Sequence, residues 1–332
     1  MPPSRRWFPL QATGYRNVAL QTKSLSAVGM VLALLAATTA CVSTAGGPSA
    51  SLANKAAGPD APAAAIRPGV RHYELIRQGE FLMVAQVLEL DLTRSDLALI
   101  TTPPNPAGGM EFIAKRTTRF LDETGAIAAI NASYFLPFAG GSPGGEDYYP
   151  REGQPASASG AVIANGAVVS PVETDLDIRV NAIVCFERLA IAIADGQACP
   201  AGFSSGVAAG PRLLAEGERR SFAAFDNRYA STPQPRTAIG VSADGRRGWM
   251  VVVDGRQKGY SDGATLQALT DLFVELGASN AINLDGGGSA TLVVEGASGE
   301  PRILNRPVHT DTPGRERPVA NHIALVPITG DR

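Results

Sequence analysis

Residues 281–294 read Ala-Ile-Asn-Leu-Asp-Gly-Gly-Gly-Ser-Ala-Thr-Leu-Val-Val, and no other stretch says as much about the fold. An apolar run ends in Asn283 and Asp285, three glycines and a serine follow, and a second apolar run begins. The pattern predicts a strand that carries a carboxylate to its end, beside a loop whose N–H groups can converge on an anion. The alternative is a plain glycine-rich turn between two strands.

Other polar side chains stand next to apolar runs in the same way. Asn131 and Asp254 each end such a run, and Arg236 opens one. Sites in sheets form where strands end and loops diverge, so we expect these groups to share a site. Taken singly, each is better explained as a turn residue, a helix cap or a surface charge, and only their repeated placement beside apolar runs favours a site. The remaining candidates of this kind are Asp262, Arg306, Arg317 and Asn321.

The first 41 residues have the composition of a secretion signal. Four basic residues and no acidic one precede an apolar stretch at residues 25–40. This stretch is shorter than the roughly twenty residues needed to cross a bilayer, which favours export over a retained anchor. Cys41 follows small residues and is the candidate lipidated cysteine of a bacterial lipoprotein, although Thr38 stands where leucine is expected. We therefore expect a periplasmic or cell-envelope lipoprotein, or a secreted protein, with a lipid on Cys41 as its route to the membrane.

The rest of the chain divides into a linker and one domain. Residues 42–68 are rich in Ala, Gly, Pro and Ser and cannot bury enough apolar surface to fold, so they are expected to form a tether. Residues 69–330 suit a single globular domain. The net charge of −2 and the pI near 6.0 argue against a nucleic-acid-binding surface. No sequence feature indicates a protein partner.

Two of the three cysteines lie inside the predicted domain. In an exported protein Cys185 and Cys199 are free to pair, closing a loop of about fourteen residues. The alternative is a pair of buried free thiols, and the sequence does not decide between them.

Strand patterns dominate the domain, and they predict an α+β fold with a strand-rich mixed sheet and a few flanking helices. Asn165-Gly166 is a strong hairpin signal between two short strands. Ser261 or Asp262 is expected to cap the last helix, which Gly277 ends. Helices are predicted at residues 110–123 and 263–276. Strands are predicted at residues 81–92, 97–101, 126–130, 161–164, 167–170, 176–184, 189–194, 237–241, 249–253, 281–284 and 319–326.

Residues 133–159 form an unusually long connection without periodicity. It is rich in glycine and proline but also holds aromatic and charged side chains, among them Tyr134, Tyr149 and Arg151. Long loops inside compact domains are functional or disordered. The aromatic content favours a lid that faces the substrate.

Several chemistries lack the residues they need. The three histidines form no pair at helical spacing and the cysteines form no cluster, so no metal site is predicted. Carboxylates and carbonyls could hold Ca²⁺, but no Asp-x-Asp loop is present. The glycine-rich stretch also lacks the features of a serine-hydrolase elbow and of a P-loop. What remains is a carboxylate working with arginines and backbone N–H groups on an anionic substrate, without a cofactor.

Short motifs such as 130–135 (INASYF), 235–240 (PRTAIG) and 283–289 (NLDGGGS) occur together in this chain. In these motifs the chain resembles the phosphodiester glycosidase family, whose bacterial members are often labelled exopolysaccharide-biosynthesis proteins. The resemblance rests on short segments that occur in the family's order between about residues 126 and 326. One departure is Ala132-Ser133, where the family commonly has Gly-Gly, and side chains there are expected to narrow the space near Asn131. The segments are 130–135 (INASYF), 210–214 (GPRLL), 235–240 (PRTAIG), 253–256 (VDGR), 259–263 (GYSDG), 283–289 (NLDGGGS), 305–307 (NRP) and 317–321 (RPVAN).

This resemblance implies cleavage of a sugar-1-phosphodiester, such as an N-acetylglucosamine-1-phosphodiester, in envelope or exopolysaccharide metabolism. A phosphate monoester is a good leaving group, so a pair of acid and base carboxylates is less necessary than in ordinary glycosidases. Asp285 is expected to be the base or nucleophile, with Asp254 and Asp262 as second choices. Arg236 and the backbone of Gly286, Gly287, Gly288 and Ser289 are expected to bind the phosphate, and Asn131 and Asn283 to orient sugar hydroxyls.

Two other functions fit the same residues. One is a non-catalytic envelope protein that binds an anionic polysaccharide, in which Asp285 is merely structural. The other is a phosphodiesterase that cuts the P–O bond, with or without Ca²⁺.

Overall fold

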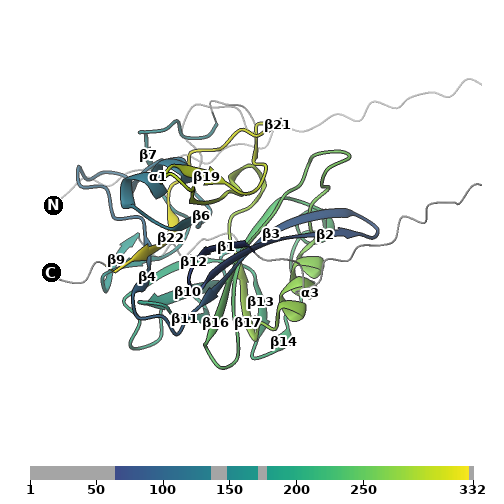
Figure 1. Cartoon of the computed structure of the whole chain (residues 1–332), viewed down its shortest axis with the longest axis horizontal. Helices are drawn as coiled ribbons and strands as arrows, with labels where there is room; N and C mark the ends of the chain where they lie inside the picture. Colours follow the sequence, from purple (N-terminus) through teal and green to yellow (C-terminus); the bar gives the residue numbers. More distant parts are fainter. Residues whose placement is uncertain (1–63, 136–147, 171–177, 329–332) are drawn as a thin grey trace, which may run out of the picture. The chain divides into compact units, whose positions relative to one another are not determined.

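The computed structural model describes residues 64–135, 148–170 and 178–328, all within one compact unit that spans Ala53–Arg332 (Figure 1). The predicted signal segment and Cys41 lie outside these residues. Within the described part of the chain, no helix is both long and apolar enough to cross a membrane.

Three antiparallel sheets make up most of the unit. The large sheet has the order β1 (Ala64–Arg67), β2 (Val70–Gln78), β3 (Leu82–Asp91), β16 (Arg247–Val253), β15 (Arg236–Val241), β17 (Asn280–Asn283), β13 (Arg212–Ala215) and β14 (Glu218–Arg219). The second has the order β11 (Ala190–Asp195), β10 (Ala182–Glu187), β12 (Ser205–Ala209), β8 (Val162–Ala164) and β9 (Ala167–Ser170). The third has the order β19 (Pro301–Ile303), β18 (Leu292–Glu295), β6 (Ala128–Asn131), β22 (His322–Pro327) and β4 (Leu97–Thr101).

Short elements complete the described fold. Two small ribbons pair β20 (Val308–His309) with β21 (Thr312–Pro313) and β5 (Phe112–Ile113) with β7 (Pro155–Ala156). The helices are α1 (Thr117–Thr124), α2 (Asn227–Ser231) and α3 (Leu266–Leu276), with a 3₁₀ turn, η1 (Gly287–Ser289).

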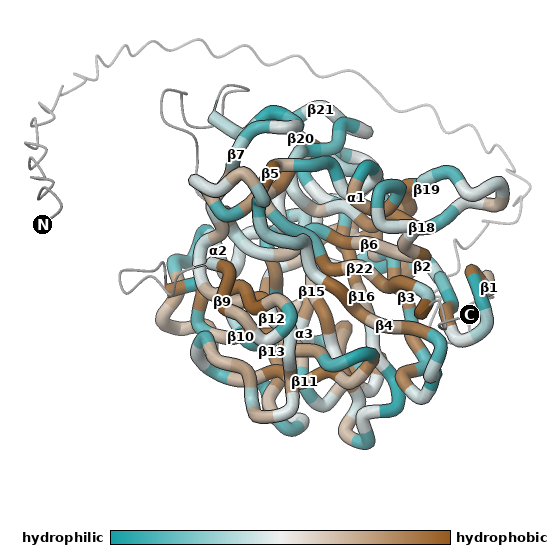
Figure 2. The backbone as a smooth tube through the Cα atoms, turned by 90° about the vertical axis from the view of Figure 1, so that its left-hand side faces the viewer, coloured by the Kyte–Doolittle hydropathy of each residue, from teal (hydrophilic) through white to brown (hydrophobic). Residues whose placement is uncertain are grey.

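The central strands of the large sheet, β3, β16, β15 and β17, are buried on both faces, which explains why they are largely apolar. Met250 and Val252 of β16 face a core shared with the other two sheets, whereas Trp249, Val251 and Val253 face a second core under α3. Successive residues of a strand point to opposite faces, so an apolar run without alternation fits a strand covered on both sides. Figure 1 shows α3 beside β13 and β17. In Figure 2 hydrophobic residues concentrate along strands such as β4, β16 and β22, and hydrophilic ones in the connections.

The strand-rich α+β character is confirmed, but the pairing differs from the prediction. The described strands pair antiparallel in all three sheets, not in a mixed sheet. Tight turns make this possible. Gly245 has φ 68° between β15 and β16, and Asn165 and Gly166, at φ 50° and 78°, join β8 to β9 as predicted.

Both predicted helices begin later than expected. Thr265, not Ser261 or Asp262, caps α3 by accepting a hydrogen bond from the Ala268 N–H. Ser261 and Asp262 are unavailable because their side chains accept hydrogen bonds from the N–H groups of Val84 and Leu82 on β3. The first helix begins at Thr117, not at residue 110, because Phe112–Ile113 pairs with β7.

Three further predictions can be compared with the fold. β1 begins inside the range predicted as a linker, because Ala64–Arg67 pairs with β2. The predicted strand at residues 176–184 begins only at Ala182, and residues 171–177 lie outside the described chain. The disulfide between Cys185 and Cys199 is present, with Cα atoms 5.7 Å apart.

Candidate active site

Asp285 lines a cavity of about 680 Å³ and lies two residues after the end of β17. The cavity has a strongly cationic lining, with five arginines and two aspartates, and aromatic rings along its wall. The charged lining residues are Arg179, Arg228, Arg236, Arg256, Arg317, Asp226 and Asp285, and the aromatic ones are Tyr134, Phe135, Tyr148, Tyr149 and Tyr229. Such a lining is complementary to an anionic ligand that has an apolar or sugar face.

Asn131, the last residue of β6, and Ala132, which follows it, hold the backbone of Asp285 by hydrogen bonds. Its N–H donates to the carbonyl of Ala132 (2.9 Å), and its carbonyl accepts from Asn131 Nδ2 (2.6 Å). The carboxylate accepts hydrogen bonds from the Ser289 hydroxyl and the Gly286 N–H. Burial nevertheless raises the pKa of Asp285 above the usual value, and the nearby positive charges of Arg317 and Arg179 offset only part of this effect. A carboxylate of raised basicity suits a general base or a nucleophile.

The three glycines after Asp285 leave room for backbone and guanidinium groups. A Cβ on Gly286 would lie 2.5 Å from the Pro235 carbonyl oxygen, and one on Gly288 would lie 2.3 Å from Arg317 Nη2. Gly287 has φ 59°, and a Cβ there would lie 3.0 Å from Arg256 Nη2. The absence of side chains in the loop therefore leaves room for the guanidinium groups of Arg256 and Arg317 beside it.

The predicted phosphate site in the loop backbone is largely occupied by internal hydrogen bonds. Gly287 N–H donates to the Pro235 carbonyl (2.8 Å), Ser289 N–H to the Gly286 carbonyl (3.1 Å), and Gly286 N–H to Asp285. Gly286, Gly287 and Gly288 line the cavity, and the predicted contact of this backbone with a phosphate stays a prediction.

Arg236 and Arg317 are the buried cations of the site. Arg236 donates to the carbonyls of Ala264 (3.0 Å) and Tyr229 (2.6 Å). Arg317 donates to His309 Nδ1 (3.0 Å) and Ser289 Oγ (3.2 Å), and Tyr149 covers its guanidinium at 3.7 Å. Burial lowers the pKa of both arginines. Each is thus held in one orientation before any ligand arrives, as electrostatic stabilisation of an anion requires.

The hydroxyl groups of two lining tyrosines, Tyr134 and Tyr229, belong to one hydrogen-bond network. The hydroxyls of Tyr134 and Tyr229 lie 2.7 Å apart and both reach the Gly210 carbonyl. Asn283 Nδ2 donates to Tyr134 (3.0 Å) and to the same carbonyl (2.8 Å). Asn283 is buried and does not line the cavity. Its predicted contact with sugar hydroxyls is therefore replaced by support of the two tyrosines that do line it.

Asn131 and Asn321 are also structural where a substrate contact was predicted. Asn131 Oδ1 accepts from Thr237 Oγ1 (2.8 Å) and from the Thr291 N–H (3.1 Å), while its Nδ2 holds Asp285. Asn321 accepts from the Ser133 N–H (2.8 Å) and donates to Ser133 Oγ (3.0 Å). Ala132 and Ser133 are buried outside the cavity lining, so they do not narrow the site as expected.

Three more predicted residues lie away from Asp285. Asp254 is buried, and its carboxylate accepts from Asn305, the Arg306 N–H and Tyr260. Asp262 is exposed and holds the start of β3. Arg306 is exposed and lies over the Tyr260 ring. None of the three lines the cavity, so neither second-choice carboxylate is placed to act with Asp285.

Sequence reasoning did not single out Arg179, Arg228, Arg256 and Tyr229 as site residues. Arg256 belongs to the quoted segment 253–256, and this was the one available signal for it. Arg179 lies in a stretch without a motif, and its guanidinium is 4.9 Å from the Tyr134 ring centroid. Of the predicted lid, Tyr134, Phe135, Tyr148, Tyr149 and Ser159 line the cavity, whereas residues 136–147 lie outside the described chain.

Comparison with family models gives one match that covers most of the described chain. Residues 124–326 match the phosphodiester glycosidase model. The chain belongs to the phosphodiester glycosidase family. A comparison with curated proteins gives no match.

Solved structures share the fold of this chain at low sequence identity. The catalytic domain of zebrafish N-acetylglucosamine-1-phosphodiester alpha-N-acetylglucosaminidase, auto-inhibited by its pro-peptide, has a TM-score of 0.56 at 18% identity, over 78% of this chain and 84% of that one. A putative exported protein of Burkholderia pseudomallei has a TM-score of 0.53 at 18% identity, over 76% of this chain and 75% of that one. A hypothetical protein from Synechocystis has a TM-score of 0.51 at 16% identity. The match covers 78% of this chain but only 62% of that protein.

The described residues contain no group of three or more His, Cys, Asp or Glu side chains that could hold a metal ion. The predicted lack of a cofactor, and the alternative of Ca²⁺, both stay predictions.

Proposed function

We propose that the protein hydrolyses a sugar-1-phosphodiester, releasing a free sugar and a phosphate monoester. One observation carries the proposal: the carboxylate of Asp285 lines a cavity together with the immobilised guanidinium groups of Arg236 and Arg317. The family match supports the same reaction class. The natural role would be in envelope or exopolysaccharide metabolism.

In this reaction the bond between the anomeric carbon and the phosphate oxygen breaks. The electron pair goes to the phosphate, which leaves as a monoester whose added charge Arg236 and Arg317 stabilise. Asp285 either takes a proton from the attacking water or attacks the anomeric carbon itself, forming an ester that water then hydrolyses. Proton donation to the leaving group is not essential because the phosphate oxygen is a weak base.

The sugar would lie against the aromatic side of the cavity. Tyr134 and Tyr229 are held by Asn283 and the Gly210 carbonyl, and Tyr149 is held on Arg317. Rings fixed in this way give a sugar a flat apolar surface with hydroxyl groups at its edge. This arrangement takes over the role first predicted for Asn131 and Asn283.

We also propose that the protein is exported and attached to a membrane by a lipid on Cys41. The Cys185–Cys199 disulfide fits an oxidising compartment. Expression of the parent and of Cys41→Ser in a bacterial host tests this. Movement from the membrane to the soluble fraction in the variant is the expected result, and an unchanged distribution would rule out the lipid.

The function is tested with a panel of sugar-1-phosphodiesters, including N-acetylglucosamine-1-phospho-methyl-mannoside, by measuring release of reducing sugar. Asp285→Asn should lower the rate by at least about a hundredfold, as loss of a general base or nucleophile does. Asp122→Asn, at an exposed position of α1, is the matched control and should retain the parental rate.

Two outcomes would contradict the proposal. Tight binding of an anionic polysaccharide without cleavage, unaffected by Asp285→Asn, would indicate a non-catalytic binding protein. In ¹⁸O-labelled water, label in the phosphate and not in the sugar would indicate cleavage of the P–O bond, as by a phosphodiesterase.

A further inference from the structure

The cavity holds more positive charge than one phosphodiester needs. Among the described residues, five arginines and two aspartates line it, whereas a phosphodiester carries a single negative charge. Like charges brought together around a cavity repel one another unless a ligand neutralises them. The surplus therefore indicates a ligand with more than one anionic group.

The arginines differ in how they are held. Arg236 and Arg317 are buried and fixed by carbonyls, His309 and Ser289. Arg228 and Arg256 are exposed at the outer part of the lining. Arg256 Nε donates to Gln234 Oε1 (2.8 Å), which leaves the rest of its guanidinium available on the cavity side. The cationic lining thus has an inner and an outer pair.

Arg256 is held in a backbone conformation that arginine rarely adopts. Its φ is 58°, in the left-handed region, and its Nη2 lies against Gly287 of the loop beside Asp285. Such a conformation costs about 1–3 kcal/mol and persists at functional positions. The charge of Arg256 also acts on both inner arginines, lowering the pKa of each. Strain and repulsion at one residue are tolerated where that residue meets a bound anion.

We propose that Arg228 and Arg256 form a second anion subsite, which binds a further phosphate group in the aglycone of the substrate. The inner pair takes the scissile phosphate, and this part of the inference rests on the proposed function. Among the described residues of the outer lining, Asp226 is the acidic one, and its carboxylate accepts from the backbone N–H of Arg228 (2.6 Å). The two positive charges of Arg228 and Arg256 exceed the single negative charge of Asp226, so the outer pair remains net positive. The substrate is a glycan phosphodiester that carries at least two phosphates.

Binding of small probes without a glycosidic bond tests the subsite independently of catalysis. The probes are glycerophosphoglycerol, with one phosphodiester; a glycerol trimer joined by two phosphodiesters; and P¹,P²-dimethyl diphosphate, with two adjoining phosphates. Calorimetry on the parent should show at least about tenfold tighter binding of one two-phosphate probe than of the single-phosphate probe. Which of the two binds better distinguishes a repeating phosphodiester from a diphosphate.

In Arg228→Gln/Arg256→Gln this preference should fall to within about twofold, because the charge-assisted contacts to the second phosphate are lost. Arg246→Gln is the control. It removes an exposed arginine that does not line the cavity, and the preference should persist. Equal or undetectable binding of all the probes to the parent, or loss of the preference in the control, would overturn the subsite. A parent that binds two-phosphate probes but releases no sugar would contradict only the proposed function.

Discussion

The position of Arg317 depends on the absence of a Cβ atom at Gly288. Arg317 is buried between the loop and the Tyr149 ring, and its Nη2 occupies the place that a side chain at position 288 would fill. The guanidinium is also bonded to His309 and Ser289, so it has little freedom to move aside. The third glycine of the motif is therefore required by an arginine that follows it by 29 positions in the sequence.

Gly288→Ala should displace Arg317 and lower kcat/KM by on the order of a hundredfold, since small misplacements of a positioning group have effects of that size. Steady-state kinetics on a cleaved phosphodiester measure the effect. Gly79→Ala is the control, because a Cβ there meets nothing within 4 Å and its backbone is not left-handed. Equal kinetics in the two variants would contradict the assigned role of Gly288.

Asp285 should make the protein less stable at neutral pH than an uncharged residue would. Its native pKa is raised, so the native state binds the proton more tightly than the unfolded state, whose value is near 3.9. The free energy of unfolding therefore falls as pH rises from about 4 through the native pKa. Asp285→Asn should match or exceed the parent in melting temperature at pH 7, and the difference should shrink below pH 4. Asp122→Asn should show no such pattern, and a destabilised Asp285→Asn would contradict the prediction.

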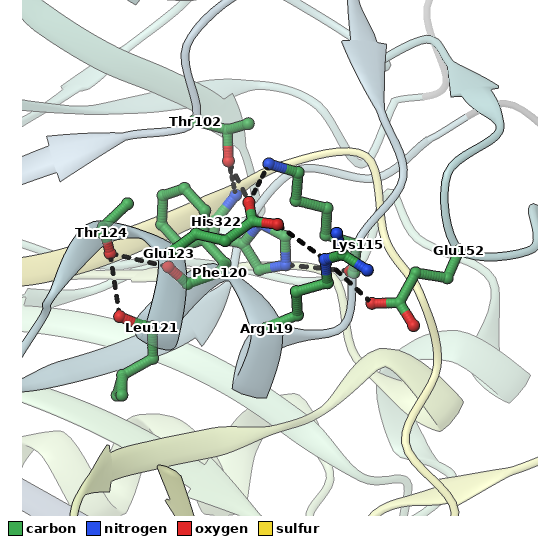
Figure 3. A network of polar contacts seen from close by, with 9 residues as sticks. All are labelled: Thr102, Lys115, Arg119, Phe120, Leu121, Glu123, Thr124, Glu152 and His322. Carbon is green, nitrogen blue, oxygen red and sulfur yellow. Dashed lines mark hydrogen bonds and ion pairs between the residues drawn. The ribbon is translucent and has the colours of Figure 1, made fainter. Parts of the chain in front are cut away.

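At the scale of elements, β22 and α1 meet through a buried histidine (Figure 3). His322 stacks on Phe120 with ring centroids 4.6 Å apart, and its Nδ1 and Nε2 lie 3.1 Å from Thr102 Oγ1 and 3.2 Å from the Lys115 carbonyl. Because a carbonyl only accepts, Nε2 carries the proton and Nδ1 accepts from Thr102. Burial lowers the pKa of His322 to about 3, so the ring is neutral in the native state.

This histidine should make the protein acid-labile. Between pH 6.5 and about 3 the unfolded state takes up a proton that the native state does not, so stability is lost as pH falls through this range. The slope is at most about 1.4 kcal/mol per pH unit. His322→Gln should flatten the pH dependence of the unfolding free energy, measured by urea denaturation. Parallel curves for parent and His322→Gln would refute this.

The predicted elements were accurate where the pattern is local. Strands at residues 97–101, 167–170, 189–194 and 249–253 agree with β4, β9, β11 and β16 to within two residues. The helix starts were wrong because Ser261, Asp262 and Phe112 take part in contacts with β3 and β7 that the sequence does not reveal. The mixed pairing was wrong because apolar strands covered on both faces are typical of parallel sheets, and here antiparallel strands are covered in the same way.

At the scale of the whole molecule, the Cys185–Cys199 disulfide restrains the unfolded chain. It closes a loop of 14 positions, which corresponds to about 3 kcal/mol in the chain-entropy model. Cys185→Ala/Cys199→Ala should lower the free energy of unfolding by about that amount relative to the oxidised parent, measured by urea denaturation, and reduction of the parent should have a similar effect. A change below about 0.5 kcal/mol would show that the restraint contributes little.

The charge of the cavity bears on metal dependence. Five arginines around Asp285 disfavour a divalent cation there by simple repulsion. Exhaustive dialysis against EDTA should therefore leave the hydrolysis rate within about twofold of the untreated enzyme. A rate that collapses and is restored by Ca²⁺ would contradict this prediction and favour the Ca²⁺ alternative.

The sequence by itself determined the strand-rich class and the position of Asp285 at the end of a strand. It also marked Arg236 and the glycine loop as neighbours of the site, because all three depend on patterns within a few residues. Only the tertiary structure decided which polar groups face the cavity. Asn131, Asn283 and Asp254 resemble site residues in sequence, yet their side chains are used in buried hydrogen bonds between strands. Arg179, Arg228 and Arg256 reach the cavity from separate segments of the chain. An asparagine that makes buried hydrogen bonds and one that binds a ligand look identical in the sequence. Only the partners that folding brings within hydrogen-bonding distance distinguish them.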